Sequence, residues 1–198
     1  MGHLLSGSSP LTASLGVFGT HVTAVITSLF LKAIPAKFKL IDLLLNKANF
    51  LPATRAQSMR SNYVLDLHNP YVEIYDQYRN NVRRNTKKAG QLNCRYVTGI
   101  PVEEVITLAH WQMQQQVTNV GEEDYAHFKD LYQLLASKEM AQTSGVYTVN
   151  GELVASCVWF YSHGRAYYIL VGNHPNGKTL GLLIILLIGL LRLMRVGR

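Results

Sequence analysis

The hydrophobic and polar residues of the first part of the chain follow two different patterns. Apolar residues recur at three- and four-residue spacing over 22–34, which predicts a helix that ends before Pro35. A short apolar run at 15–19 predicts a strand that ends on a glycine, and the run at 38–45 predicts a buried strand. The segment 46–57 is mixed in character and has no period, so we expect a connection there.

Beyond this connection the periodicity becomes clearer. Alternation over 62–67 predicts a strand with its larger apolar residues on one face. Asn69 and Pro70 supply an N-cap and a proline in the first turn for a helix that extends to Gly90, where a C′ residue belongs. Acidic residues lie early in this helix and basic residues late, as the helix dipole favours. Three further elements are expected in chain order: a strand at 94–98, a helix opened by Pro101 and a helix over 122–140.

The last third of the chain predicts an antiparallel meander. Asn150-Gly151, between the apolar runs 145–149 and 153–161, is the strongest short-range hairpin signal and predicts a two-residue turn. A second turn at 162–165 leads into a strand at 166–171. A loop at 172–179 and an apolar helix to about residue 196 complete the pattern.

Composition limits the class of protein. The chain has 198 residues, of which 48% are hydrophobic and 16% charged, so it has enough apolar surface to fold. Nineteen basic residues against twelve acidic ones give a net charge of +7, which predicts anionic partners. The two cysteines form neither a disulfide framework nor a metal-ligand spacing. We therefore expect a cytoplasmic protein without metal catalysis.

Two apolar stretches have to be distinguished from membrane segments. The stretch 11–31 has no charged residue but is interrupted by many polar ones and glycines, and no basic region or cleavage pattern marks it as a signal peptide. The stretch 180–191 has only 12 residues, which is too short to span a bilayer. We expect no integral membrane span.

The loop 172–179 matches the phosphate-binding pattern of Gly172, four residues, Gly177, Lys178 and Thr179. Such a loop can curl its backbone amides around an anion at the start of a helix. A nucleoside triphosphatase also needs an acidic residue for magnesium, and none follows Thr179. Two interpretations stay open, an anion site and a plain Asn-Gly turn followed by a solvated lysine.

A basic segment forms the second candidate site. Six basic residues and no acidic one lie between positions 79 and 95. Arg83 and Lys87 are one helical turn apart, as are Arg84 and Lys88, so two basic ridges are expected. Guanidinium groups bind phosphates and carboxylates well, but the same residues also suit a solvated helix end. The histidines show no ligand spacing, and Cys157 lies in a predicted strand, where a core role is expected.

Three segments carry a resemblance to a known family. The sequence Asn-Val-Arg-Arg-Asn-Thr-Lys-Lys-Ala at 81–89 resembles a motif of the FemAB-like branch of the GNAT acyltransferase superfamily. The hairpin around 150–155 is similar to the paired central strands of a GNAT domain. The strand 167–171, followed by 177–181 and a helix, resembles the strand, pyrophosphate loop and helix that hold acyl-coenzyme A in that superfamily.

This resemblance implies an α/β (α+β) fold with a GNAT-like mixed, largely antiparallel central sheet flanked by helices and incomplete at both ends. Residues 1–50 would be the tail of a first GNAT-like domain, 51–58 a connection, and 59–198 a second GNAT-like domain without its terminal strands.

The implied function is an N-acyltransferase. The donor would be acetyl-CoA, another acyl-CoA or an aminoacyl-tRNA, and the acceptor a primary amine of a small molecule or cell-wall precursor; neither DNA nor a metal is implied. Donor-binding residues would be Val171, Asn173, Gly177, Lys178, Thr179 and Gly181; an anionic acceptor or donor group would contact Arg83, Arg84 and Lys87; Tyr167 or Tyr168 would protonate the leaving thiolate. The alternatives are a non-catalytic module that binds RNA or another polyanion through the basic helix, and a P-loop-like nucleotide-binding protein.

Overall fold

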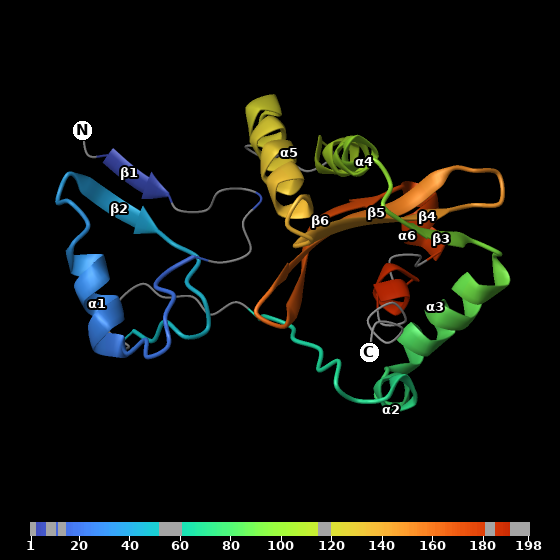
Figure 1. The fold of residues 1–198 in the computed structure, drawn as a ribbon, viewed down its shortest axis with the longest axis horizontal. Helices are drawn as coiled ribbons and strands as arrows, with labels where there is room; N and C mark the ends of the chain where they lie inside the picture. The colour runs from blue at the N-terminus through green and yellow to red at the C-terminus, as the bar shows by residue number, and fades with distance from the viewer. Residues whose placement is uncertain are drawn as a thin grey trace. The chain divides into compact units, whose positions relative to one another are not determined.

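The chain forms two compact units, Met1–Val64 and Leu65–Arg198 (Figure 1). The computed structural model describes residues 3–6, 11, 15–51, 61–114, 120–180 and 185–190. The connection expected at 51–58 lies, except for Leu51, outside the described residues.

The first unit contains a helix between two parallel strands. β1 (His3–Ser6) pairs in parallel with β2 (Phe38–Asp42), and α1 (Ala24–Lys32) lies between them in the sequence. The Thr23 hydroxyl accepts a hydrogen bond from the Ile26 N–H and caps α1, whose prediction is confirmed.

Both strands predicted in this unit differ from the structure. The strand expected at 15–19 is reduced to one isolated bridge between Leu15 and Leu45, because Gly16 turns the chain with a φ of +105°. The run at 38–45 is a strand over 38–42, but the expectation that it is buried is wrong, since Ile41 is exposed. The described sheet of this unit has two strands, and side chains of β2 such as Ile41 stay open to solvent.

The second unit is built on a four-stranded antiparallel sheet, which confirms the predicted fold class. The strands are β3 (Arg95–Thr98), β4 (Ala141–Tyr147), β5 (Leu153–Ser162) and β6 (Arg165–Asn173), in the spatial order β3-β4-β5-β6. The helices are α2 (Tyr71–Asp76), α3 (Asn80–Gln91), α4 (Val102–Gln114), α5 (Glu122–Ala136) and α6 (Pro175–Leu180). Figure 1 shows α4 and α5 on one face of the sheet and α3 on the other.

Each face of this sheet has its own core. On the α4/α5 face, the rings of Phe128 and Phe160 stack with centroids 5.7 Å apart. On the α3 face, Ala89 of α3 and Leu186 of the C-terminal helical segment 185–190 pack in one buried cluster with Trp159. Apolar side chains are therefore buried on both faces of the sheet.

The two hairpins have turns of different length. Thr148 N–H donates to the Glu152 carbonyl, and Gly151, with a φ of +80°, ends a three-residue turn, so the expected two-residue Asn-Gly turn is wrong although the hairpin is confirmed. The two-residue turn instead joins β5 to β6, where His163 and Gly164 both have positive φ.

The segment before β3 departs most from the prediction. Residues 62–67 form no strand, and Tyr63 is 93% exposed. The single helix expected from 71 to 90 is two helices, because the chain leaves helical geometry at 77–79. Pro70, not Asn69, occupies the N-cap of α2. Gly90 lies inside α3, and the left-handed residue beyond the helix is Asn93, with a φ of +50°.

No helix among the described residues is both long enough and apolar enough to cross a membrane.

Candidate active site

The end of β6 passes almost directly into α6. Asn173 ends the strand and Pro175 begins the helix, so only His174 lies between them. The predicted loop over 172–179 is therefore wrong, and with it the phosphate-loop geometry, which needs an extended glycine-rich turn. Gly172 is a strand residue and Gly177 belongs to the first turns of α6.

These two glycines are needed for close packing. A Cβ atom at Gly177 would lie 2.1 Å from the carbonyl oxygen of Val154, and one at Gly172 would lie 2.8 Å from the backbone nitrogen of Ala109. Both distances are shorter than real Cβ contacts, so each position requires glycine for a backbone that approaches closely. Gly177 brings α6 against β5, and Gly172 brings α4 against β6.

The structure brings three of the predicted donor-binding residues together. Val171 and Asn173 lie two residues apart on β6 and share the sheet face that α3 covers, since their partners Cys157 and Ala155 belong to the core on that face. The Asn173 Oδ1 lies 2.9 Å from the position that a Cβ of Gly177 would occupy. Lys178 and Thr179 are in α6, but their side chains, and all of Gly181, lie outside the described residues.

Asn173 carries an unusual feature for a buried side chain. It is 7% exposed, and its Oδ1 has no hydrogen-bond partner among the residues that the structure describes. A buried acceptor without a donor costs about 1–3 kcal/mol, so natural proteins rarely keep one without a reason. A ligand amide or hydroxyl that donated to this oxygen would remove the cost.

His174 forms a small cluster that the sequence pattern did not identify. The backbone N–H of His174 donates to the Val154 carbonyl at 3.0 Å. The His174 ring stacks on Trp111 with centroids 5.6 Å apart, and its Nδ1 lies 3.6 Å from a carboxylate oxygen of Glu152. The partners come from α4 and the β4–β5 turn, which are distant in sequence. No local spacing could have predicted this contact.

The two candidate tyrosines lie on opposite faces of β6. Tyr167 pairs with Phe160 and shares its α4/α5 face, whereas Tyr168 pairs with Trp159, whose ring lies 4.9 Å away. A register shift leaves Ile169 as an extra residue, a β-bulge, next to Tyr168. Desolvation raises the pKa of the Tyr168 hydroxyl above its ordinary value, although 37% of the residue is exposed, and like any tyrosine it is protonated at neutral pH. Only Tyr168 shares a face with Val171 and Asn173.

Strand geometry separates Tyr168 from the Asn173 end of β6. Five residues at about 3.3 Å each place the two backbones about 16 Å apart. An elongated ligand would be needed to contact both.

The three predicted cations of α3 do not form one cluster. Arg83 donates a hydrogen bond to the Asp76 carbonyl at the end of α2, and its guanidinium lies 5.6 Å from the Tyr75 ring centroid. Arg84 and Lys87 are exposed and, in the part of the chain that the structure describes, form no ion pair. Arg83 therefore joins α2 to α3, and Arg84 and Lys87 face solvent.

Cys157 has the core role predicted for it. It is fully buried and is not in a disulfide, and burial raises the pKa of its thiol, which makes it a poor nucleophile. The neighbouring Ser144 hydroxyl accepts a hydrogen bond from the Trp159 indole at 3.0 Å and lies 2.9 Å from the Tyr96 hydroxyl. Among the described residues, no three His, Cys, Asp or Glu side chains come together as metal ligands.

A four-stranded antiparallel sheet with helices on both faces, whose last strand leads straight into a helix, defines an α/β domain. Residues 76–196 match the family model of the acetyltransferase (GNAT) domain, which is more than half of the chain. The chain belongs to this GNAT family, and the match lies entirely within the second unit. None of the curated proteins compared with the chain matches it.

Membership of the family gives the general activity. GNAT domains are N-acetyltransferases that generally use acyl-CoA donors such as acetyl-CoA, so this chain is a transferase of the N-acetyltransferase type.

Proposed function

We propose that the second unit binds acyl-CoA along β6 and at the β6–α6 junction, and transfers the acyl group to a primary amine. The observation that carries this proposal is the Oδ1 of Asn173, which is buried beside Gly177 at that junction and has no partner among the described residues. A buried acceptor that no described protein group satisfies fits a donor group on a bound molecule. The neighbouring Lys178 and Thr179 supply a cation and a hydroxyl of the kind that phosphates require.

β6 offers a second binding element. It is the outer strand of the described sheet, so one edge of its backbone has no strand partner there. An extended ligand with amide groups can pair with such an edge as an added strand does. The pantetheine arm of acyl-CoA has this character and would run along β6 between Asn173 and Tyr168.

The chemistry follows from what the bound donor supplies, an acyl group activated as a thioester. The neutral amine attacks the carbonyl carbon, so that a C–N bond forms and the C–S bond breaks. Backbone N–H groups of the β6 edge would stabilise the oxyanion that develops. Tyr168 would pass its proton to the departing sulfur and regain one from solvent, while the amine loses one proton to solvent, so the products are an amide and a thiol and the domain returns to its starting state. Holding both reactants in this orientation is the main contribution of the domain.

We further propose that the chain is of the FemAB-like branch, whose acceptors are amines of small molecules or cell-wall precursors and whose donor can be aminoacyl-tRNA. The resemblance of the segment 81–89 to a motif of this branch supports the proposal. Arg84 and Lys87 in this segment are exposed and form no ion pair in the described residues, so they can contact an anionic acceptor or a tRNA. Arg83 is not available for such contacts while its guanidinium donates to the Asp76 carbonyl of α2.

Titration calorimetry of the full chain with acetyl-CoA tests donor binding. We expect saturable 1:1 binding that weakens about tenfold or more in Lys178→Ala, since a hydrogen bond to a charged group contributes about 1.5–3 kcal/mol. Lys88→Ala, which removes an exposed lysine of α3, serves as the matched control and should bind like the wild type. Absence of binding, or an equal loss in both variants, would reject the proposal.

A second candidate function rests on the exposed face of α3, formed by Arg84, Lys87 and Lys88. Three cations without ion pairs in the described residues are suited to the phosphate backbone of RNA. If RNA is the physiological partner, the affinity for poly(U) falls steeply with salt, and Arg84→Ala lowers the slope by about one unit. A shallow slope that Arg84→Ala leaves unchanged would exclude this function.

A further inference from the structure

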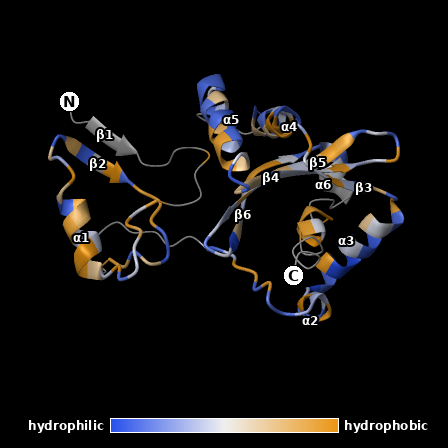
Figure 2. Ribbon diagram, in the orientation of Figure 1, coloured by the Kyte–Doolittle hydropathy of each residue, from blue (hydrophilic) through white to orange (hydrophobic). Residues whose placement is uncertain are grey.

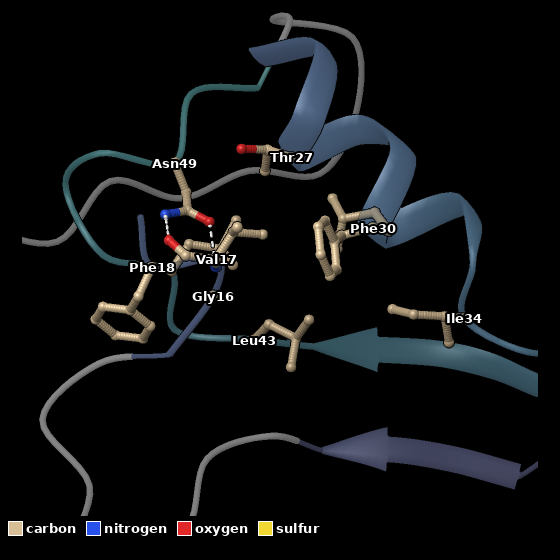
Figure 3. Close-up of a pocket in the computed structure, with 10 residues that line it drawn as sticks. Gly16, Val17, Phe18, Thr27, Phe30, Ile34, Leu43 and Asn49 are labelled. Carbon is tan, nitrogen blue, oxygen red and sulfur yellow. Dashed lines mark hydrogen bonds between the residues drawn. The ribbon is translucent and has the colours of Figure 1, made fainter. Parts of the chain in front are cut away.

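A cavity of about 330 Å³ lies in the first unit, between α1 and the chain that follows β2 (Figure 3). Pockets for small ligands have volumes of about 300–1,000 Å³, so this cavity has the size of a ligand site. Its walls include Val17, Thr27, Phe30, Leu31, Ile34 and Leu43. The GNAT match begins after this unit, so the cavity lies outside the matched residues.

The described walls are mostly apolar, and the polar side chains among them, Thr27 and Asn49, are already hydrogen-bonded. Positions 27, 30 and 31 bring one face of α1 to the cavity, and Ile34, just beyond the end of α1, adds to the same wall. The Thr27 hydroxyl donates to the Thr23 carbonyl at 3.1 Å and is therefore engaged within the helix. The Asn49 side chain donates to the Val17 carbonyl at 2.9 Å and accepts from the Val17 N–H at 2.8 Å. A polar ligand would lose its hydration in this cavity without gaining a partner.

Hydrogen bonds hold one wall in place. Asn46 donates to the carbonyls of Leu15 and Val17 at 3.1 and 3.2 Å, and Asn49 donates to the Asn46 Oδ1 at 2.8 Å. Gly16 has a φ of +105°, and a Cβ there would lie 2.5 Å from the Asn49 Oδ1. The segment 16–18 is thus fixed by polar contacts behind it, and the cavity beside it is formed in advance of binding.

The apolar side chains around the cavity are poorly covered. Of the described residues of the first unit, only Thr27 is buried, while Phe30 is 62% exposed and Phe18 is 72% exposed. Figure 2 shows α1 largely in the hydrophobic colours, and Figure 3 shows the Phe18 and Ile34 side chains at opposite ends of the cavity. Removal of this surface from water would provide the driving force for an apolar occupant.

The net charge of the first unit indicates which polar group an apolar ligand of this cavity would carry. Residues 1–64 contain six basic residues and a single acidic one, Asp42. Lys32 follows the cavity residue Leu31 at the end of α1, and Lys37 lies three residues beyond Ile34. An anionic group outside the cavity mouth would be attracted by this excess of positive charge.

We propose that this cavity binds the hydrocarbon chain of a medium-chain fatty acid, with the carboxylate in water near the basic residues of the unit. The cavity is lined by residues of the first unit, so the proposal does not depend on where the acyl-transfer site of the second unit is assigned. A fatty acid meets both requirements, since its chain needs no hydrogen bond and its carboxylate complements the local charge.

Binding of decanoate to the full chain, measured by calorimetry below its micellar concentration, tests the proposal. We expect saturable 1:1 binding that is at least fivefold tighter than that of decanol, and no binding of butanoate. Leu31→Trp fills the cavity and should weaken decanoate binding tenfold or more. Leu29→Trp places the same side chain on an exposed, non-lining position of α1 and should leave binding unchanged. Circular dichroism verifies that both variants keep the wild-type helix content.

A spin-labelled fatty acid provides a second measurement that needs no variant. It should broaden the methyl resonances of Leu31, Ile34 and Leu43 before those of the second unit. Failure of decanoate to saturate, equal effects of the two tryptophan variants, or broadening confined to the second unit would overturn the proposal. Loss of binding on dilution, in parallel with dissociation of a dimer, would assign the cavity to a second copy of the chain and would also overturn it.

Discussion

At the scale of single residues, glycine had the least predictable role. Gly172 and Gly177 match a phosphate-loop pattern, yet the structure uses them where backbones approach within contact distance. The atoms that require glycine belong to Ala109 and Val154, which are distant in sequence. A local pattern therefore could identify the β6–α6 junction as special but could not show why.

A matched pair of substitutions tests this role. Gly177→Ala places a Cβ 2.1 Å from the Val154 carbonyl oxygen and should lower the free energy of unfolding by about 1–3 kcal/mol, since the backbone must shift. Gly90→Ala meets no atom within 4 Å inside α3 and should raise it by about 0.5–1 kcal/mol through helix propensity. Urea denaturation measures both. Equal effects of the two substitutions would contradict the packing role of Gly177.

Tyr147 predicts a dependence of stability on pH. Burial, and then its hydrogen bond to Glu104 at 2.8 Å, raise the pKa of Tyr147 to about 12 from an ordinary value of 10.0. The folded state therefore keeps this proton while the unfolded state loses it, so the contribution is complete below pH 10 and disappears between pH 10 and 12. In Tyr147→Phe the free energy of unfolding should fall less across this window. Parallel curves for the two proteins would show that Tyr147 does not contribute.

At the scale of elements, the sequence predicted best where local signals and burial agree. The helices α1, α4 and α5 and the β4–β5–β6 meander follow the expected order, because each has a period or turn signal that the sheet then buries. The strand expected at 62–67 failed because alternation alone does not provide a partner strand. The break between α2 and α3 was missed because the basic and aromatic residues keep a helical period across it.

Because of this break, alanine substitutions of Arg83 and Arg84 should differ in their effect on the free energy of unfolding. Arg83 joins α3 to the Asp76 carbonyl and the Tyr75 ring, so Arg83→Ala should lower the free energy of unfolding by about 1–2 kcal/mol. Arg84→Ala removes an exposed cation without a partner in the described residues and should change stability by less than about 0.5 kcal/mol. Thermal denaturation followed by circular dichroism measures both. A larger loss in Arg84→Ala would contradict the contacts of Arg83.

At the scale of the whole molecule, the two compact units differ in what is known of them. The second unit contains the GNAT match and the candidate site, of which Val171, Asn173 and Gly177 were predicted from sequence and do lie together. The cluster of Trp111, Glu152 and His174 could not be predicted, since it depends on three elements that meet only in the fold. The first unit contains an apolar cavity that no sequence motif marks.

The central claim is that the donor lies along β6 and at its junction with α6. Backbone amide spectra of the isotopically labelled full chain, recorded during titration with acetyl-CoA, test this placement directly. We expect saturable shifts at Tyr168, Val171, Asn173 and Gly177, and no comparable shifts at the exposed α3 residues Arg84 and Lys88 or in the first unit. Saturable shifts confined to α3 or to the first unit, or no shifts at any concentration, would contradict the account.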